Sequence, residues 1–403
     1  MDFSDTPEEA AYRAQVRTWL AANAPKEGFS NTDGMTIDQE IARARAWQTK
    51  KAEAGYAQIT WPKAWGGPGG TPMQQVIYNQ EEANYDVYAP YFVLALGMCV
   101  PTILSVADEA TKQRFAGPAL RGEEIWCQLF SEPVSGSDAA GARTMAVRDG
   151  DTWTVNGQKV WTSGAHLSDY GLLLTRTDVN VPKHKGMTMY WLDMRSPGVE
   201  VRRINQMSGG GGYGFNEVFF TDVKIPDSQR LGAVGEGWKV AIITLMNERF
   251  AIGGGRSEGW EQVIELARGA GMLSDRALRE KIADWYVQAS GLKHTAMRTI
   301  TALSRGETPG PENSIGKIVG ANQAQSMASE AIDLLDQYGI IADPALAPLE
   351  AEFQSGLLHA PGGRLAGGTD EILKNVLAER VLGLPGDIRL DKDVAYKDIP
   401  TGR

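Results

Sequence analysis

The fold is decided by a stretch in the middle of the chain, residues 153–163, which read Trp153-Thr154-Val155-Asn156-Gly157-Gln158-Lys159-Val160-Trp161-Thr162-Ser163. Around Asn156-Gly157 the side-chain pattern has a period of two, which is the period of a β-strand. The Asn-Gly dipeptide supplies the positive φ angles that a two-residue turn needs. The stretch therefore predicts a β-hairpin with Asn156-Gly157 at its tip.

More strand-like runs follow this hairpin, separated by Gly, Pro, Asp and Asn. They cover residues 170–175, 187–192, 199–204 and 216–225. Short runs bounded by turn residues at such regular spacing are typical of an all-β domain. We expect this β domain to span residues 126–235.

Helical signals precede the β domain. The sequence Thr6-Pro7-Glu8-Glu9 is typical of a capping box with proline at the first helical position. Apolar residues then recur at helical spacing until Pro25 ends the helix. An apolar helix is also expected over residues 91–106, with Pro101 at its start or at a kink. We assign residues 1–125 to an N-terminal α-helical domain.

Helical periodicity returns after the β domain and continues almost to the end of the chain. The predicted helices cover residues 238–256, 259–269, 275–306, 314–338 and 370–382. We expect residues 236–403 to form a C-terminal helical bundle. About the last fifteen residues lack this periodicity and are predicted to be a tail.

Charge and composition exclude several classes of protein. The chain has 40 Lys and Arg against 50 Asp and Glu, a net charge of −10, so neither nucleic acid nor an anionic membrane is expected as the main partner. No stretch approaches the ~20 apolar residues of a membrane span, and the N-terminus lacks the apolar region of a signal peptide. With only two cysteines and four scattered histidines, we expect a cytoplasmic protein without disulfides or a metal site.

Three segments carry chemistry. Residues 126–138 end in a turn rich in hydroxyls and glycine that suits a polar ligand, residues 161–165 place an aromatic plane beside two hydroxyls, and residues 366–372 lead through glycines into Thr369 as a helix N-cap that favours an anion. Taken singly, each has a plain structural interpretation: a connecting turn, a core tryptophan and an ordinary cap. The glycine motifs of Rossmann and P-loop sites are absent from the sequence.

In this order and at these separations, the three segments resemble the acyl-coenzyme A dehydrogenase family. The specific matches are Phe130-Ser131-Glu132-Pro133 with Gly136-Ser137-Asp138, the stretch from Asn156 to Ser163, and Gly368-Thr369-Asp370-Glu371-Ile372 with Ala378-Glu379-Arg380-Val381-Leu382-Gly383. The resemblance covers essentially the whole chain. It implies an α+β multidomain fold, with an N-terminal helical domain, a middle β-barrel and a C-terminal four-helix bundle.

The resemblance also implies a function: an FAD enzyme that oxidises an acyl-CoA thioester to its trans-2,3-enoyl product and passes electrons to an electron-transfer flavoprotein. By similarity, the flavin contacts are Gln128, Phe130, Ser131, Ser137, Trp161, Thr162, Ser163, Thr369 and Glu371. Ser163 matches a hydroxyl position near flavin N5. The expected substrate contacts are Ser137, Arg249 and Gly368.

The catalytic base departs from the commonest family pattern. Removal of the weakly acidic α-proton needs a carboxylate, together with donors that polarise the thioester carbonyl. Many relatives carry that carboxylate at the position matching Gly367, where this chain has no side chain. Another branch carries it on an earlier helix, at the position matching Glu248. We therefore assign Glu248 as the base and the Gly367 backbone N–H as a donor to the thioester; a solvated Glu248 paired with Arg249 is the structural alternative.

A second departure concerns assembly. Relatives often hold FAD with an Arg-x-x-Phe-Gly segment, which is absent from the matching residues 267–275. This pattern resembles bacterial members that act on bulky, branched or ring-bearing acyl-CoAs, some of them α₂β₂ heterotetramers. Either a homo-oligomer or such a hetero-oligomer is therefore expected. The alternative functions are a non-catalytic or FAD-supporting partner subunit, and another elimination or oxidation at a CoA thioester.

Overall fold

A computed structural model of the chain describes residues 5–32, 34–208, 212–252, 259–305, 307 and 310–400, without the side chains of residues 248–252, 303 and 304. The chain divides into two compact units. The first unit comprises residues 1–248 together with 388–403, and the second comprises residues 249–387. Each unit has a hydrophobic core of its own and is described by itself.

The first unit begins with helices whose starts are set by threonine caps. In α1, α2 and α3 the side chains of Thr6, Thr36 and Thr71 each accept a hydrogen bond from the backbone amide three residues on, within a full capping box. The predicted cap at Thr6 is thus confirmed, and α1 ends before Pro25. The helices of this region are α1 (Pro7–Asn23), α2 (Ile37–Glu53), α3 (Pro72–Glu82), α4 (Val100–Val106) and α5 (Glu109–Leu120).

The apolar stretch over residues 91–106 is less regular than a single helix. A 3₁₀ turn (Pro90–Phe92) is followed by a π-helix (Ala95–Cys99), and α4 begins only at Val100. Pro101 lies in the first turn of α4, where its missing N–H costs no helical hydrogen bond. The expectation of one helix here is therefore wrong, whereas Pro101 does mark a helix start.

The middle of the first unit is an eight-stranded sheet with the order β6-β7-β3-β2-β4-β5-β8, to which β1 adds by pairing with β4. Most neighbours are antiparallel, and β1 is parallel to β4. Within the described residues the sheet is not closed into a barrel. Its strands are β1 (Trp126–Leu129), β2 (Met145–Asp149), β3 (Thr152–Lys159), β4 (Tyr170–Arg176), β5 (Met187–Asp193), β6 (Val199–Arg203), β7 (Asn216–Pro226) and β8 (Arg230–Leu231).

The predicted hairpin at Asn156-Gly157 is wrong, because β3 runs straight through this dipeptide. The pairing of β3 with β7 shifts register between Val155 and Gly157, which is the signature of a β-bulge. The Asn156 side chain exchanges two hydrogen bonds with Asp222 across the bulge. Gly157 has φ +151°, and a Cβ there would lie 2.7 Å from the Cα of Thr144. The sequence signal was therefore a bulge, where only glycine fits.

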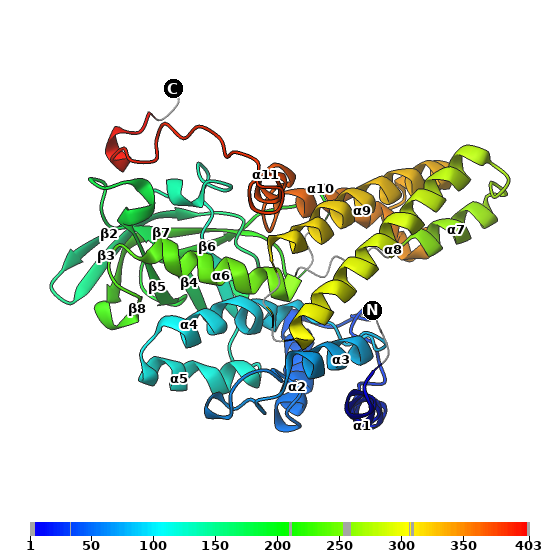
Figure 1. The fold of residues 1–403 in the computed structure, drawn as a ribbon, viewed down its shortest axis with the longest axis horizontal. Helices are drawn as coiled ribbons and strands as arrows, with labels where there is room; N and C mark the ends of the chain where they lie inside the picture. Colours follow the sequence, from blue (N-terminus) through cyan, green and yellow to red (C-terminus); the bar gives the residue numbers. More distant parts are fainter. Residues whose placement is uncertain are drawn as a thin grey trace. The chain divides into compact units, whose positions relative to one another are not determined.

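The two faces of the sheet pack into different cores. Leu172 and Leu174 point to a core that α4, α5 and α6 (Gly237–Ile252) share, while Leu173 between them belongs to the other core. Alternate residues of a strand point to opposite faces, so β4 is buried on both sides. Figure 1 shows the helices α4, α5 and α6 beside the sheet.

The second unit is entirely helical in its described residues. A core of apolar side chains from α7 to α10, among them Val263, Trp285, Met327 and Phe353, holds it together. The helices are α7 (Trp260–Gly269), α8 (Arg276–Ser304), α9 (Ser314–Leu335), α10 (Glu352–Leu365) and α11 (Asp370–Arg380), and Figure 1 shows α8 and α9 running side by side. No helix in the part of the chain that the structure describes is long and apolar enough to cross a bilayer.

The end of the chain returns to the first unit. Residues 388–400, called the C-terminal strap below, form backbone hydrogen bonds with residues 179–182 through the amides of Tyr396 and Lys397. In Figure 1 the strap is the red segment that leads to the C-terminus. The predicted tail is therefore a docked segment without helical periodicity.

Candidate active site

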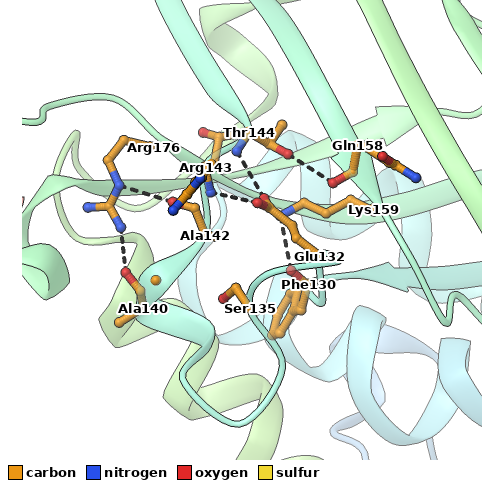
Figure 2. Close-up of polar contacts among 12 residues, drawn as sticks. Phe130, Glu132, Ser135, Ala140, Ala142, Arg143, Thr144, Gln158, Lys159 and Arg176 are labelled. Carbon is orange, nitrogen blue, oxygen red and sulfur yellow. Dashed lines mark hydrogen bonds and ion pairs between the residues drawn. The ribbon is translucent and has the colours of Figure 1, made fainter. Parts of the chain in front are cut away.

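A buried ion pair joins two of the segments that the sequence singled out. Lys159, the last residue of β3, lies 2.7 Å from the Glu132 carboxylate, and their side chains are 0% and 4% exposed. The Lys159 ammonium also donates to the Phe130 carbonyl at 3.0 Å. Figure 2 shows this cluster. The pair thus ties the end of β3 to the loop of residues 130–142, the 130–142 loop below.

Glu132 is the organising acceptor of this loop. Its carboxylate oxygens accept from the backbone amides of Arg143 (2.6 Å) and Thr144 (3.0 Å), in addition to Lys159. Its own amide and carbonyl exchange hydrogen bonds with Ser135, which closes a tight turn. One buried carboxylate therefore fixes both ends of a twelve-residue excursion between Glu132 and Thr144.

Burial and pairing act in opposite directions on the pKa of Glu132. Burial raises it, but the charge and hydrogen bond of Lys159, with donors from Arg143 and Thr144, outweigh burial and hold the pKa below its ordinary value. Burial lowers the pKa of Lys159, against the attraction of Glu132. The carboxylate is the form that these donors stabilise, so we treat Glu132 as ionised.

The segment that follows Lys159 presents an aromatic plane to solvent. Trp161 adopts the left-handed conformation (φ +58°), is 58% exposed, and packs only its edge geometry against Phe215 at 5.9 Å. The preceding amide, of Val160, donates to the Ser131 carbonyl at 2.9 Å. A tryptophan in a strained, exposed conformation is unusual for a core residue, so the structural alternative of a buried core tryptophan is excluded.

Thr162 and Ser163 lie directly behind this plane. The Thr162 backbone exchanges hydrogen bonds with Asn216, whose side-chain amide donates to the Thr162 carbonyl at 2.8 Å. The Thr162 hydroxyl is buried and has no hydrogen-bond partner within the described residues. Ser163 is half-buried. An orphaned buried hydroxyl costs stability unless a ligand satisfies it.

These features fit a planar heteroaromatic cofactor such as the isoalloxazine ring of FAD. An exposed aromatic face, an unpaired hydroxyl and a half-buried serine are grouped within residues 161–163, and the Val160 and Lys159 contacts hold them beside Phe130 and Ser131. The other predicted contacts on this loop and strand differ in exposure: Gln128 is half-buried and Ser137 is exposed. The structure thus brings the predicted contacts of the first unit into one neighbourhood.

The glycine loop before α11 belongs to the second unit. Gly367 and Gly368 have φ values of +64° and +95°, and the Thr369 hydroxyl accepts from the Ile372 amide at 3.3 Å. The predicted N-cap at Thr369 is therefore confirmed. Glu371 is exposed in the first turn, and its own backbone amide and Thr369 lower its pKa, as expected at a helix start.

A second polar cluster holds this glycine loop in place. The Lys317 ammonium, on α9, donates to the carbonyls of Gly368 (2.6 Å) and Arg364 (3.1 Å). The Asp370 carboxylate accepts from Arg364 (2.8 Å) and Asn322 (2.9 Å). Burial would raise the pKa of Asp370, but these donors lower it. The backbone around Gly367 is thus fixed by charged side chains.

The helix that carries the predicted base is described as far as its backbone. Glu248 and Arg249 lie in α6, whose side chains from residue 248 onward fall outside the described part. One turn earlier, the buried Thr244 hydroxyl lies 3.0 Å from that of Thr102 on α4. The helix is therefore anchored on the sheet core immediately before position 248. The predicted roles of Glu248 and Arg249 stay predictions.

Two features of this region were not predicted from the sequence. The Glu132–Lys159 pairing was missed, although both residues lie in quoted motifs; the signal was a lysine at a strand position whose neighbours in alternation are apolar. Arg176 was also missed. It is fully buried at the end of β4, and its guanidinium donates to the carbonyls of Ala140, Ala142 and Lys183 (Figure 2).

Comparisons with known proteins agree with this architecture. The chain matches the acyl-CoA dehydrogenase N-terminal domain over residues 6–123, the middle domain over residues 127–223 and the C-terminal domain over residues 235–382.

Two curated relatives come from Mycobacterium tuberculosis. Acyl-CoA dehydrogenase IpdE1 is 34% identical over 94% of this chain and 98% of its own length. Acyl-CoA dehydrogenase FadE34 is 37% identical over 84% of this chain, which spans only 46% of that longer protein.

A solved structure, that of the Tcur3481-Tcur3483 steroid ACAD G363A variant, superimposes with a TM-score of 0.76 at 25% identity, covering 94% of this chain and 99% of the other. The expected order of helical, β and helical regions is confirmed by these matches. The chain belongs to the acyl-CoA dehydrogenase family and is an oxidoreductase of that family.

Proposed function

We propose that the chain is an FAD-dependent acyl-CoA dehydrogenase that desaturates the Cα–Cβ bond of a thioester with a bulky, branched or ring-bearing acyl group. One proton leaves Cα, a hydride leaves Cβ, and the product is the trans-2,3-enoyl thioester. The substrate class is supported by the steroid ACAD among the similar structures. An electron-transfer flavoprotein is the proposed final acceptor.

The residues of the first unit that would hold the flavin are those around Trp161. Trp161 offers its exposed face, and the Thr162 and Ser163 hydroxyls offer donors that the protein leaves without partners in the case of Thr162. Phe130 and Ser131 would complete this wall, and Thr369 and Glu371 are the proposed contacts from the second unit. Bound FAD supplies the hydride acceptor. The Glu132–Lys159 pair keeps the wall in shape.

The observation that carries the assignment of the base is the backbone of Gly367. Its φ of +64° lies in the left-handed region, where glycine is unstrained and a residue with a side chain loses roughly 1–2 kcal/mol. A carboxylate at this position would therefore be built on strained backbone. This supports Glu248 as the proton acceptor, with the Gly367 N–H and Ser137 as polar contacts of the thioester.

Position 248 is suited to this role by the way that α6 is anchored. It follows the buried Thr244 by four residues, so both positions share one face of the helix. An anchored helix holds a general base within a narrow range of positions, and proton transfer needs such positioning. Arg249 is the proposed basic contact for the CoA moiety.

The alternative is a partner subunit that supports FAD or is not catalytic, within a hetero-oligomer. The specific observation that favours it is the departure in residues 267–275, where the Arg-x-x-Phe-Gly segment is absent. The Arg268 of this stretch is exposed and pairs with Glu265 on its own helix. In that case, phosphate contacts would come from another chain.

Anaerobic titration with a panel of straight, branched and steroid-like acyl-CoA thioesters distinguishes the two functions. The dehydrogenase is expected to be purified with flavin, and the visible flavin absorbance should bleach with at least one bulky thioester. Flavin that bleaches only after co-expression with a second polypeptide would support the partner subunit. Protein that binds no FAD, alone or with a partner, would exclude both.

A further inference from the structure

The C-terminal strap contacts the 130–142 loop at the end that is far from the Glu132 turn. The Tyr396 hydroxyl donates to the Gly141 carbonyl at 3.0 Å. The two neighbouring carbonyls, of Ala140 and Ala142, accept from the buried guanidinium of Arg176. Three successive carbonyls are therefore held by one arginine and one tyrosine.

The same tyrosine covers the arginine. The Arg176 guanidinium lies 3.7 Å from the centroid of the Tyr396 ring, and Arg176 is completely buried. Within the described residues no carboxylate forms a salt bridge with Arg176. A buried cation without a paired anion depends on carbonyl acceptors and on an aromatic face, so the strap supplies part of what keeps Arg176 in place.

A second contact joins the strap to the loop through Lys183. The Lys183 ammonium lies 2.8 Å from the Asp138 carboxylate on the loop and 2.7 Å from the Asp391 carboxylate on the strap. The side chain of Lys183 is 15% exposed, so this bridge is partly protected from solvent. The strap therefore reaches both Asp138 and Gly141.

These contacts act on the stretch that carries Ser137. The Ser135 hydroxyl donates to the Asp138 carbonyl at 2.6 Å, and the Gly141 amide donates to the same carbonyl at 2.8 Å. The exposed Ser137 lies between Ser135 and Asp138 and has no contact of its own that would fix it among the described residues. Its position depends on the two ends of this short segment.

We propose that the C-terminal strap positions the 130–142 loop for the acyl-CoA substrate, with Tyr396 as the main positioning residue and Asp391 as the second. The Glu132–Lys159 pair fixes the first end of the loop, and the strap fixes the second end through Arg176 and Lys183. Tyr396 acts through Gly141 and Arg176 on Ser137. The role in substrate binding rests on the proposed function, whereas the effect of the strap on the loop does not.

The test compares three single variants of the full chain. Tyr396→Ala removes the ring and the hydroxyl, Tyr396→Phe keeps the ring, and Lys397→Ala is the control, because Lys397 is an exposed neighbour on the strap. The first measurement is amide hydrogen exchange of residues 135–144. Tyr396→Ala should accelerate it about tenfold, and Lys397→Ala should leave it unchanged.

The second measurement is steady-state kinetics with the thioester that bleaches the wild-type flavin best. Tyr396→Ala should raise KM about tenfold with kcat within about twofold of wild type, because the loop is loosened while the base is untouched. Tyr396→Phe should recover most of this loss and stay within about threefold of the wild-type KM. The dissociation constant of FAD, from titration of the apoprotein, should change less than KM does.

Equal exchange in Tyr396→Ala and Lys397→Ala would overturn the proposal. So would a fall in the unfolding midpoint of Tyr396→Ala with KM unchanged, since that is a purely structural role. If Tyr396→Ala does not fold, Tyr396→Phe decides: a KM equal to that of wild type together with unchanged exchange at Gly141 would refute it. Wild-type protein that never bleaches contradicts the dehydrogenase function, and the exchange measurement then still tests the strap.

Discussion

Removing the buried charge of Lys159 should weaken the first unit more than removal of any exposed lysine. In Lys159→Met, the Glu132 carboxylate stays buried and keeps only the amides of Arg143 and Thr144 as donors. Loss of one partner of a buried pair costs about 3–5 kcal/mol. Because two donors remain, we expect the lower end of this range, about 3 kcal/mol.

The assay is thermal unfolding followed by near-UV circular dichroism, with FAD titration of the apoprotein alongside. For a unit of this size, about 3 kcal/mol corresponds to a fall in the midpoint of roughly 6–12 °C. FAD should bind more weakly, because Lys159 also holds the Phe130 carbonyl. Lys224→Met is the matched control, since the Lys224 ammonium donates to the Thr154 hydroxyl on the exposed surface of the same sheet.

A double-mutant cycle separates the pairing from loss of packing. In Lys159→Met combined with Glu132→Gln, no unpaired charge is buried, so the loss should be about 2 kcal/mol smaller than the sum of the two single losses. The reasoning is refuted if Lys159→Met costs less than about 1 kcal/mol and so resembles Lys224→Met, or if the two single losses are simply additive.

Two further perturbations test the glycine bulge and the second polar cluster. Gly157→Ala places a Cβ 2.7 Å from the Thr144 Cα, so it should cost about 1–3 kcal/mol in thermal unfolding, and an unchanged midpoint would contradict the bulge geometry. The pKa of Asp370 is lowered from its ordinary value of 3.8, so its stabilisation is present above that pH and is lost as the pH falls through the lowered value. Wild-type helical signal should therefore fall more steeply than that of Asp370→Asn in acid titration below about pH 4, and parallel curves would contradict this.

Local signals in the sequence predicted the helix starts well. The capping boxes at Thr6 and the cap at Thr369 depend on residues within three positions of each other, so the pattern contains all the information that is needed. The β region was also predicted, because strand periodicity is local. The turn at Asn156-Gly157 was wrong, since the reciprocal hydrogen bonds that decide for a bulge come from Asp222, 66 residues away.

The parts of the candidate site that were missed depend on long-range pairing. Lys159 and Glu132 were each visible in a motif, but nothing local shows that a lysine and a glutamate 27 residues apart form one buried pair. The docking of Tyr396 on Gly141 spans 255 residues, and its only sequence signal is an aromatic residue in a segment without periodicity. The flavin contacts were accessible through the family resemblance, which does not reveal what holds them in position.

The measurement that tests the central claim most directly is the anaerobic reduction of flavin in Glu248→Gln by the best thioester for the wild type. Glu261→Gln, an exposed carboxylate in the first turn of α7, is the matched control. The account predicts that Glu248→Gln binds FAD normally and loses at least about a hundredfold in the rate of bleaching, while Glu261→Gln keeps the wild-type rate. Bleaching of Glu248→Gln at the wild-type rate would contradict it.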